Sequence, residues 1–444
     1  MIVLIENVKN ILRQLSSSRD FFSRPINRAA GLVRKRKFWS PGFPVILLIA
    51  LNVVLALLLS GGLRGGIFPS STVSPGDLSG LKEMNLRQLT RHFHSLAEKR
   101  GAAYAWKSGV AAANGNLLPP GTDLHLFGHG IAKDIYREKG VRGIQLCTND
   151  LRNACSHEIV VGVFSDGGLS RLKDIREACY EAPGGKGAYT MCFHGLGHGV
   201  LAYADYDFKE AVNICGSVGT PEYAGREAVE CVGGAVMEMM AGVNDPTAWE
   251  KQKDKYLKKG DPLSPCDMDF MPDEARDICY TYLTPNLFVS AGANLSSPQP
   301  KYFKKAIGFC DSIKDVGNRR ACYGGFGKEF VVLANARDIQ NVSDMGATKL
   351  RLIHEWCSSS GNDAAARECT ASALQSLYWG GENNFRVGIR FCENTPDSSM
   401  KEECFSQFFG AVNYYAKDVG YKKKVCEGVP ESHNKKCREA LGVF

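Results

Sequence analysis

A chain of 444 residues that is 44% hydrophobic and 23% charged, with 16 cysteines, is not a disordered chain, a small disulfide-rich miniprotein or a polytopic channel. The formal net charge of +7 arises in residues 1–42, which hold nine basic and two acidic residues and leave 45 of each to the rest of the chain. A neutral body releases few counterions from a phosphate backbone, so no nucleic-acid partner is expected.

The N-terminal elements indicate a membrane anchor. Residues 43–59 carry no ionisable side chain, and a transmembrane signal-anchor helix is predicted over residues 43–63. Four basic residues, 34–37, directly precede this run, so the positive-inside rule predicts a cytoplasmic arm over residues 1–42 and an extracytoplasmic C-terminal part of a single-pass cell-membrane protein. A cleaved signal peptide is the competing interpretation, but no A-x-A cleavage site follows the run.

The rest of the chain divides into a stalk and one long domain. Residues 64–80 are rich in glycine, serine and proline and are predicted to form a flexible stalk. Residues 81–444 are predicted to form the exported domain, in which residues 123–240 make up histidine-rich first repeats.

The cysteines of this domain fall into eight successive couples with 7 to 15 residues between partners. The couples are Cys147 and Cys155, Cys179 and Cys192, Cys215 and Cys231, Cys266 and Cys279, Cys310 and Cys322, Cys357 and Cys369, Cys392 and Cys404, and Cys426 and Cys437. An even number of cysteines in an exported domain predicts disulfide bonds. Pairing within couples uses all sixteen cysteines. Pairing each second cysteine with the first cysteine of the next couple would leave Cys147 and Cys437 unpaired, so pairing within couples is preferred. Structural zinc on thiolates would need close C-x-x-C couples, which the sequence lacks.

The segments around the cysteines also repeat. The first cysteine of a couple ends a predicted helical segment such as FKEAVNIC, and the second begins another such as CYGGFGKEFVVL. Turn-forming residues lie between the two segments. Second cysteines recur every 33 to 48 residues, which is the period of helical-hairpin arrays. The predicted fold class is therefore all-α: an α-hairpin repeat solenoid with one disulfide per repeat, preceded by a single transmembrane helix.

One disulfide per helical hairpin resembles the cysteine-rich, tetratricopeptide-like repeat proteins that bacteria export. The resemblance covers about residues 123 to 444 and concerns architecture alone, because the Leu-Gly and Tyr signature of that family is not evident. It implies binding of a peptide, glycan or protein partner on the repeat surface.

Aligning the repeats on the second cysteine reveals histidines at two fixed places, two and six residues after it. In a degenerate leading unit, Asp123 takes the place of the cysteine. The histidines at these places are His125, His129, His157, His194 and His198. Later units carry other residues at both places, so the repeat itself does not require histidine, and the other four histidines of the chain have no partners in this scheme.

Side chains four residues apart are neighbours on a helix, and packed helices lie about 8 to 10 Å apart, so these histidines are expected to converge on one face. A site made of imidazoles suits zinc or copper, and after them iron or haem, whereas calcium and magnesium prefer oxygen ligands. The absence of C-x-x-C-H argues against covalent c-type haem. Glu158 and Glu238 are candidate carboxylates for orienting a ligand or acting as a general base.

The sequence thus predicts an anchored, exported helical-repeat protein that binds a transition metal or metal cofactor, and a metal-dependent activity would follow from that site. The alternative is a non-enzymatic binding scaffold with structural histidines, which hydrogen-bond neighbouring carbonyls. The familiar nucleotide-binding and hydrolase motifs are missing, so the question of enzymatic activity stays open at this stage.

Overall fold

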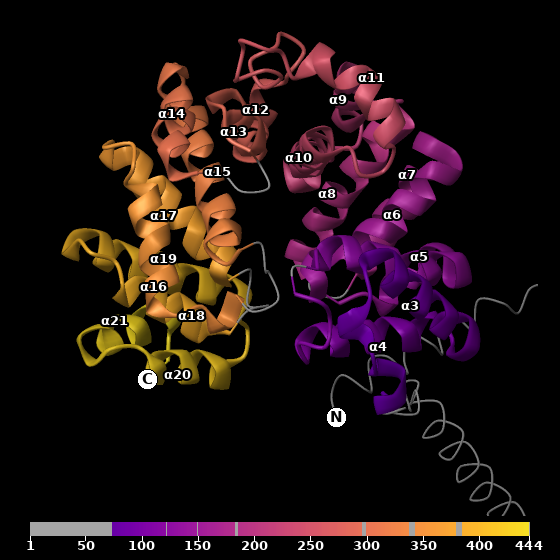
Figure 1. Ribbon diagram of the computed structural model, residues 1–444, viewed down its shortest axis with the longest axis horizontal. Coiled ribbons are helices and arrows are strands. Elements are labelled where there is room, and N and C mark those ends of the chain that lie inside the picture. The colour runs from indigo at the N-terminus through magenta and orange to yellow at the C-terminus, as the bar shows by residue number, and fades with distance from the viewer. Residues whose placement is uncertain are drawn as a thin grey trace, which may run out of the picture. The chain divides into compact units, whose positions relative to one another are not determined.

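Helices and the connections between them account for the whole of the described chain. The computed structural model describes residues 73–443 apart from 121, 149, 183, 184, 295–298, 337–341 and 379–383, and no β-strand occurs among these residues (Figure 1). They lie in one compact unit, 71–444. The predicted all-α class with its disulfides is therefore confirmed for this part of the chain.

The α-helices of the described chain have the following bounds. The first α-helices are α3 (Leu86–Arg100), α4 (Ala102–Asn114), α5 (Leu124–Lys139), α6 (Ala154–Gly167), α7 (Leu172–Glu181), α8 (Gly185–Tyr203), α9 (Phe208–Gly216), α10 (Arg226–Ala241), α11 (Pro246–Tyr256) and α12 (Asp273–Tyr282). They are followed by α13 (Thr284–Ala291), α14 (Phe303–Gly308), α15 (Val316–Ala334), α16 (Ala347–Cys357), α17 (Asp363–Tyr378), α18 (Phe385–Glu393), α19 (Ser398–Tyr415), α20 (Val419–Gly428) and α21 (Glu431–Leu441).

The predicted fold class was wrong in one respect, the transmembrane helix. Within the part of the chain that the structure describes, none of the helices combines the length and the apolar composition that crossing a bilayer requires. The predicted span, residues 43–63, and the predicted cytoplasmic arm, residues 1–42, lie outside the described residues. The fold class is corrected to an all-helical, disulfide-linked repeat domain.

The start of the described chain packs against the first helices. Residues 73–80, which the sequence analysis assigned to the stalk, include a 3-10 turn at Pro75–Leu78. The Asp77 carboxylate accepts a hydrogen bond of 2.8 Å from the Tyr104 hydroxyl and lies 3.1 Å from the Arg100 guanidinium. The Asp77 carbonyl is 2.8 Å from Nε2 of His92. These contacts attach the segment to α3 and α4.

Aspartates in the connections within and between the couples become helix caps. The side chains of Asp207, Asp315, Asp397 and Asp418 each accept a hydrogen bond from a backbone N–H in the first turn of the following helix. Such a cap satisfies one of the N–H groups that a helix start leaves without a partner, which contributes about 1 kcal/mol. The short polar segments therefore set where the helices begin.

All eight disulfides join the two cysteines of one couple, and no cysteine is free. Their Cα atoms are 5.3 to 5.8 Å apart, within the ordinary range for a disulfide. In most couples the first cysteine lies at the end of one helix and the second in the next, for example Cys215 in α9 and Cys231 in α10. The bridges therefore fasten each hairpin at its turn.

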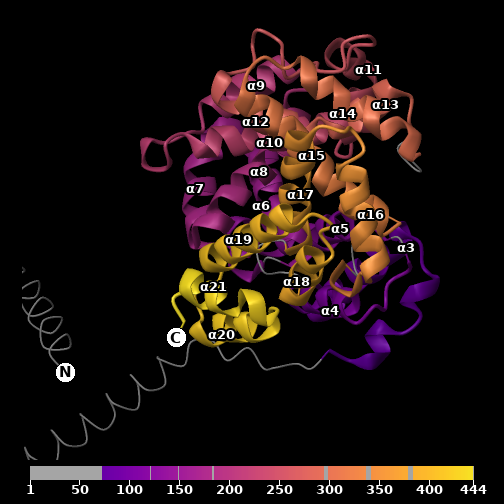
Figure 2. The same cartoon turned by 90° about the vertical axis from the view of Figure 1, so that its left-hand side faces the viewer.

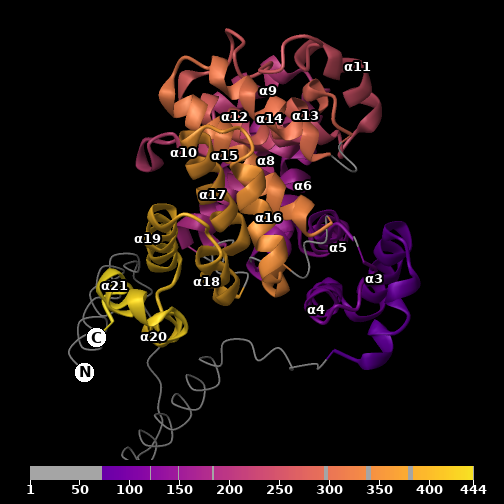
Figure 3. The same cartoon turned by 60° about the vertical axis from the view of Figure 1, so that its left-hand side comes forward.

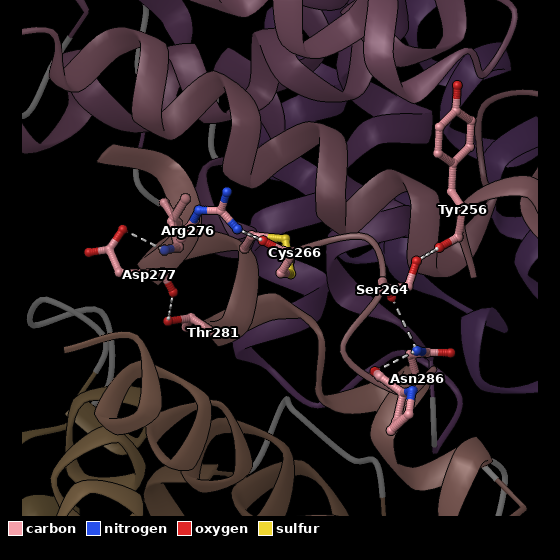
Figure 4. The surroundings of a disulfide bond; sticks show 10 residues. Tyr256, Ser264, Cys266, Arg276, Asp277, Thr281 and Asn286 are labelled. Carbon is pink, nitrogen blue, oxygen red and sulfur yellow. Dashed lines mark hydrogen bonds between the residues drawn. A yellow bond between two sulfur atoms is a disulfide. The ribbon is translucent and has the colours of Figure 1, made fainter. Parts of the chain in front are cut away.

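One couple departs from this pattern because its first cysteine lies in a loop. Figure 4 shows Cys266 beside α12, where the Arg276 guanidinium donates a hydrogen bond of 2.9 Å to the Cys266 carbonyl. The Ser264 hydroxyl donates to the Tyr256 carbonyl, and the Asn286 amide donates to the carbonyl of Ser264. Side-chain hydrogen bonds thus replace a helix in holding this bridge.

The eight helices that contain the second cysteines form one continuous row, which α5 precedes. The series α5, α6, α8, α10, α12, α15, α17, α19 and α21 packs in that order, each helix against the next. The shorter helices α7, α9, α16, α18 and α20 pack on members of this row, and the same succession can be followed in Figures 2 and 3. Residues at one offset from the second cysteine therefore recur along neighbouring helices of the row.

We expect the bridges to stabilise the array substantially. Replacing both Cys215 and Cys231 with alanine opens a loop with a sequence separation of 16, and the entropy regained by the unfolded chain lowers the free energy of unfolding by about 3 kcal/mol. Urea denaturation of the variant and the wild type measures this loss. An unchanged midpoint would show that the bridge contributes nothing to stability.

Candidate metal centre

Three neighbouring helices of the row carry the five histidines that the repeat alignment singled out. His125 and His129 lie on α5, His157 on α6, and His194 and His198 on α8. Because α6 packs against both α5 and α8, His157 lies between the two i, i+4 pairs.

Glycines allow these helices to approach closely. A Cβ atom at Gly195 would lie 2.5 Å from the Cα of His157, and one at Gly128 would lie 2.6 Å from the Cβ of Ala154. Between α8 and α10 the approach is closer still, since a Cβ at Gly197 would lie 2.0 Å from the carbonyl oxygen of Cys231. The helices that carry the histidines are therefore in close backbone contact at these positions.

The imidazole rings form one connected cluster. Ring centroids are 4.7 Å apart for His125 and His129, 5.3 Å for His125 and His157, 5.8 Å for His157 and His194, and 5.4 Å for His194 and His198. Two imidazoles bound to one tetrahedral ion with metal–nitrogen distances near 2.1 Å have centroids about 5 Å apart. The spacing of the rings is therefore that of metal ligands.

Hydrogen bonds to Nδ1 fix which nitrogen points into the cluster. Nδ1 of His125 is 3.2 Å from the Leu151 carbonyl oxygen, and Nδ1 of His129 is 2.9 Å from a carboxylate oxygen of Glu158. Both acceptors need a hydrogen on Nδ1 when the rings are neutral, which leaves the lone pair on Nε2 in each ring. The two Nε2 atoms are 3.3 Å apart, close to the roughly 3.4 Å that separates two nitrogen ligands of tetrahedral zinc. Two lone pairs facing each other at this distance repel unless a cation or proton lies between them.

His157 supplies a third nitrogen to this pair. It is 2% exposed, and neither of its ring nitrogens has a hydrogen-bond partner in the described structure. One ring nitrogen each from His125, His129 and His157 lies within 4.8 Å of the others. A buried polar atom without a partner costs about 1 to 3 kcal/mol, and a bound metal ion would supply the missing partner. These three histidines could hold a metal ion.

On α8, His198 has the same support as His129. Nδ1 of His198 is 3.2 Å from the carboxylate of Glu238, while its Nε2 is buried without a hydrogen-bond partner. Nδ1 of His194 also lacks one, and the nearest carboxylate oxygen, from Glu230, is 3.7 Å away. The two candidate carboxylates, Glu158 and Glu238, therefore each contact one histidine of a pair.

Burial lowers the pKa of three histidines of the cluster. Desolvation, followed by repulsion from His129 and His198, holds the pKa of His125 well below its ordinary value. Desolvation and the four neighbouring histidines do the same to the pKa of His157. Desolvation also lowers the pKa of His198, against the opposing effect of Glu238. Neutral imidazole is the form that binds metals.

Several contributors to the site carry no recognisable pattern in the sequence. Glu238 accepts hydrogen bonds from the Tyr206 hydroxyl and the Asn244 backbone N–H, and the Tyr282 ring lies 5.1 Å from that of His194. The Leu151 carbonyl comes from a turn in which residues 151–153 have φ of 54°, 56° and 64°. This left-handed backbone costs about 1 to 2 kcal/mol per residue. No offset from a cysteine could have revealed these contacts.

The four other histidines have protein partners. His92 contacts the Asp77 carbonyl, His94 the Asp134 carboxylate, and His433 the Glu402 carboxylate. Nε2 of His354 is 3.1 Å from the Phe391 carbonyl, and its ring stacks on that of Phe391. Nδ1 of His354 is nevertheless buried without a hydrogen-bond partner, as are nitrogens of the cluster, so the cluster is distinguished by the convergence of several rings.

We expect the metal-free protein to lose stability below pH 6.5. Burial lowers the pKa of His354 to about 4. The unfolded chain therefore binds a proton at this histidine near pH 6.5, whereas the folded chain does not. The free energy of unfolding therefore falls as the pH falls, by at most about 1.4 kcal/mol per pH unit for each such histidine. His125, His157 and His198 act in the same direction. Urea titrations in chelator between pH 7 and 5 measure the slope, which His354→Phe should reduce by one proton; equal slopes would contradict this account.

Comparison with known protein families, curated proteins and solved structures found no match to this chain. The structure shows that the described chain is all-helical and disulfide-linked. The resemblance to tetratricopeptide-like repeats stays a prediction.

Proposed function

We propose that this domain is a transition-metal-binding protein, with zinc or copper held by the cluster of His125, His129, His157, His194 and His198. The observation that carries the proposal is the pair of Nε2 atoms 3.3 Å apart, in rings whose Nδ1 atoms contact the Leu151 carbonyl and the Glu158 carboxylate. A carbonyl or carboxylate on the far nitrogen is the usual support of a metal-binding histidine.

The donor set favours a bare ion over haem. The rings contact one another with centroids 4.7 to 6.5 Å apart, and such contacts leave no space for a porphyrin between them. Imidazoles without thiolate ligands suit zinc and copper. Zinc at such a site acts as a Lewis acid, and copper adds redox chemistry.

The rival interpretation, a metal-free scaffold with structural histidines, leaves several ring nitrogens of one cluster without hydrogen-bond partners in the protein. His157 has none for either nitrogen, and Nε2 of His198 has none. The proposal includes an oxidising compartment, because all sixteen cysteines are paired and disulfides persist there.

Elemental analysis tests the proposal. The full-length protein is incubated with Zn(II), Cu(II) or Fe(II), desalted and analysed, and we expect at least one equivalent of zinc or copper. The triple variant His125→Ala, His129→Ala, His157→Ala should lose most of it, whereas His92→Ala with His94→Ala should retain it. Less than about one-tenth of an equivalent in the wild type would overturn the proposal, given the affinities of multi-histidine sites.

A further inference from the structure

The cluster is built as two similar halves around His157. The pair His125 and His129 has centroids 4.7 Å apart, and the pair His194 and His198 has centroids 5.4 Å apart. Both values lie near the roughly 5 Å expected of two imidazoles on one tetrahedral ion. Across the cluster, the rings of His129 and His198 are 6.5 Å apart, farther than the rings within either pair.

Each half has its own carboxylate on one Nδ1. Glu158 lies 2.9 Å from His129, and Glu238 lies 3.2 Å from His198. Both carboxylates therefore hold their histidine with Nε2 free, as in a carboxylate–histidine–metal arrangement. The same support occurs on both sides of the cluster.

His157 faces both halves, and binding one ion through each of its nitrogens would require the ring to release its remaining N–H proton to solvent and bridge as an imidazolate. Its ring is 5.3 Å from that of His125 on one side and 5.8 Å from that of His194 on the other. Both of its nitrogens are buried and lack a partner. One ion can bind only one of them, and a single ion on the first pair would leave Nε2 of His198 and Nδ1 of His194 without partners as well. Each such atom costs about 1 to 3 kcal/mol.

Each carboxylate that contacts the cluster has one of the histidines as its ionic partner. The Glu238 side chain is 1% exposed, and among the described residues its ionic partner is His198, with no lysine or arginine within ion-pair distance. Glu158, 13% exposed, likewise has His129 as its ionic partner. Both carboxylates are largely removed from water, and a cation bound to the neighbouring pair of histidines would lie close to each of them.

From these observations we propose that the cluster holds two transition-metal ions, one on His125 and His129 and the other on His194 and His198, with His157 between them. This inference rests on the proposed function and deepens it, because it assigns a second metal site to α8. The ions are of the imidazole-preferring class, zinc or copper.

Metal counting on two double variants tests the inference. The full-length wild type, loaded with Zn(II) and desalted, should retain two equivalents. His125→Ala with His129→Ala should retain one, and so should His194→Ala with His198→Ala. The variant His354→Ala, which removes a buried histidine outside the cluster, should retain two. One equivalent in the wild type would overturn the second site while leaving the proposed function intact, and none would overturn both.

Spectroscopy and gentler variants guard against misfolding of the alanine variants. Copper(II) loaded to two equivalents should give a magnetically coupled electron paramagnetic resonance signal, and each double variant should give an isolated copper(II) signal. Glu158→Gln and Glu238→Gln should each weaken one of two zinc-binding steps by about 10- to 100-fold and leave the other unchanged. Isolated copper signals at full loading, or one step weakened by both glutamine variants, would contradict two separate sites.

Discussion

Saturating zinc raises the free energy of unfolding of the full-length chain by about 4 kcal/mol at a free zinc concentration a thousand times the dissociation constant. The gain arises because the folded chain presents converging imidazole lone pairs, with the Nε2 atoms of His125 and His129 3.3 Å apart, whereas the unfolded chain does not. Urea denaturation with zinc, and again with a chelator in excess, measures the difference.

The control for this result is the triple variant His125→Ala, His129→Ala, His157→Ala. It removes the three histidines whose ring nitrogens lie within 4.8 Å of one another, so zinc should stabilise it far less than the wild type. If zinc stabilised both proteins equally, it would be acting elsewhere on the chain, and the cluster would not be the metal centre.

Alanine at Gly197 lowers the free energy of unfolding by about 3 kcal/mol or more. Its Cβ would lie 2.0 Å from the Cys231 carbonyl oxygen and 2.7 Å from the Ala235 nitrogen, and these backbone atoms can yield only if α8 and α10 separate. Forcing extra atoms into such a contact costs about 1 to 3 kcal/mol, and more where the backbone must move. Because His194 and His198 share α8 with Gly197, zinc affinity should fall as well.

Gly187→Ala on the same helix is the matched control. No atom lies within 4 Å of the Cβ position there, so alanine should be neutral or stabilise the helix by about 0.5 to 1 kcal/mol. Thermal denaturation of both variants separates the steric effect from the helical preference of alanine. Equal melting temperatures would show that α8 and α10 are not in close contact at Gly197.

The repeat could be predicted from the sequence because the spacing of the cysteines and the period of the helical segments are both visible in short stretches of the chain. Cysteine couples such as Cys215 and Cys231, with turn-forming residues between them, define each hairpin, and the second-cysteine helices pack in succession. That succession is the reason why histidines at equal offsets, such as His157 and His194, lie 5.8 Å apart. The transmembrane helix predicted over residues 43–63 depended on composition alone. The part of the chain that the structure describes contains no membrane-spanning helix.

The supporting contacts of the site could not be predicted in the same way. Glu158 follows His157 in the sequence but contacts His129 on the preceding helix, because neighbouring residues on a helix point in different directions. Glu230 and Tyr282 approach His194 from α10 and α12. Such contacts depend on the packing of one helix against the next, which the spacing of residues within a repeat does not encode.

The most direct test of the metal centre is the X-ray absorption spectrum of the zinc-loaded, full-length protein. The account predicts a first shell of nitrogen and oxygen ligands near 2.0 to 2.1 Å, with the outer-shell scattering of at least three imidazoles and no sulfur. A sulfur shell near 2.3 Å, or a shell of oxygen atoms without imidazole scattering, would contradict it.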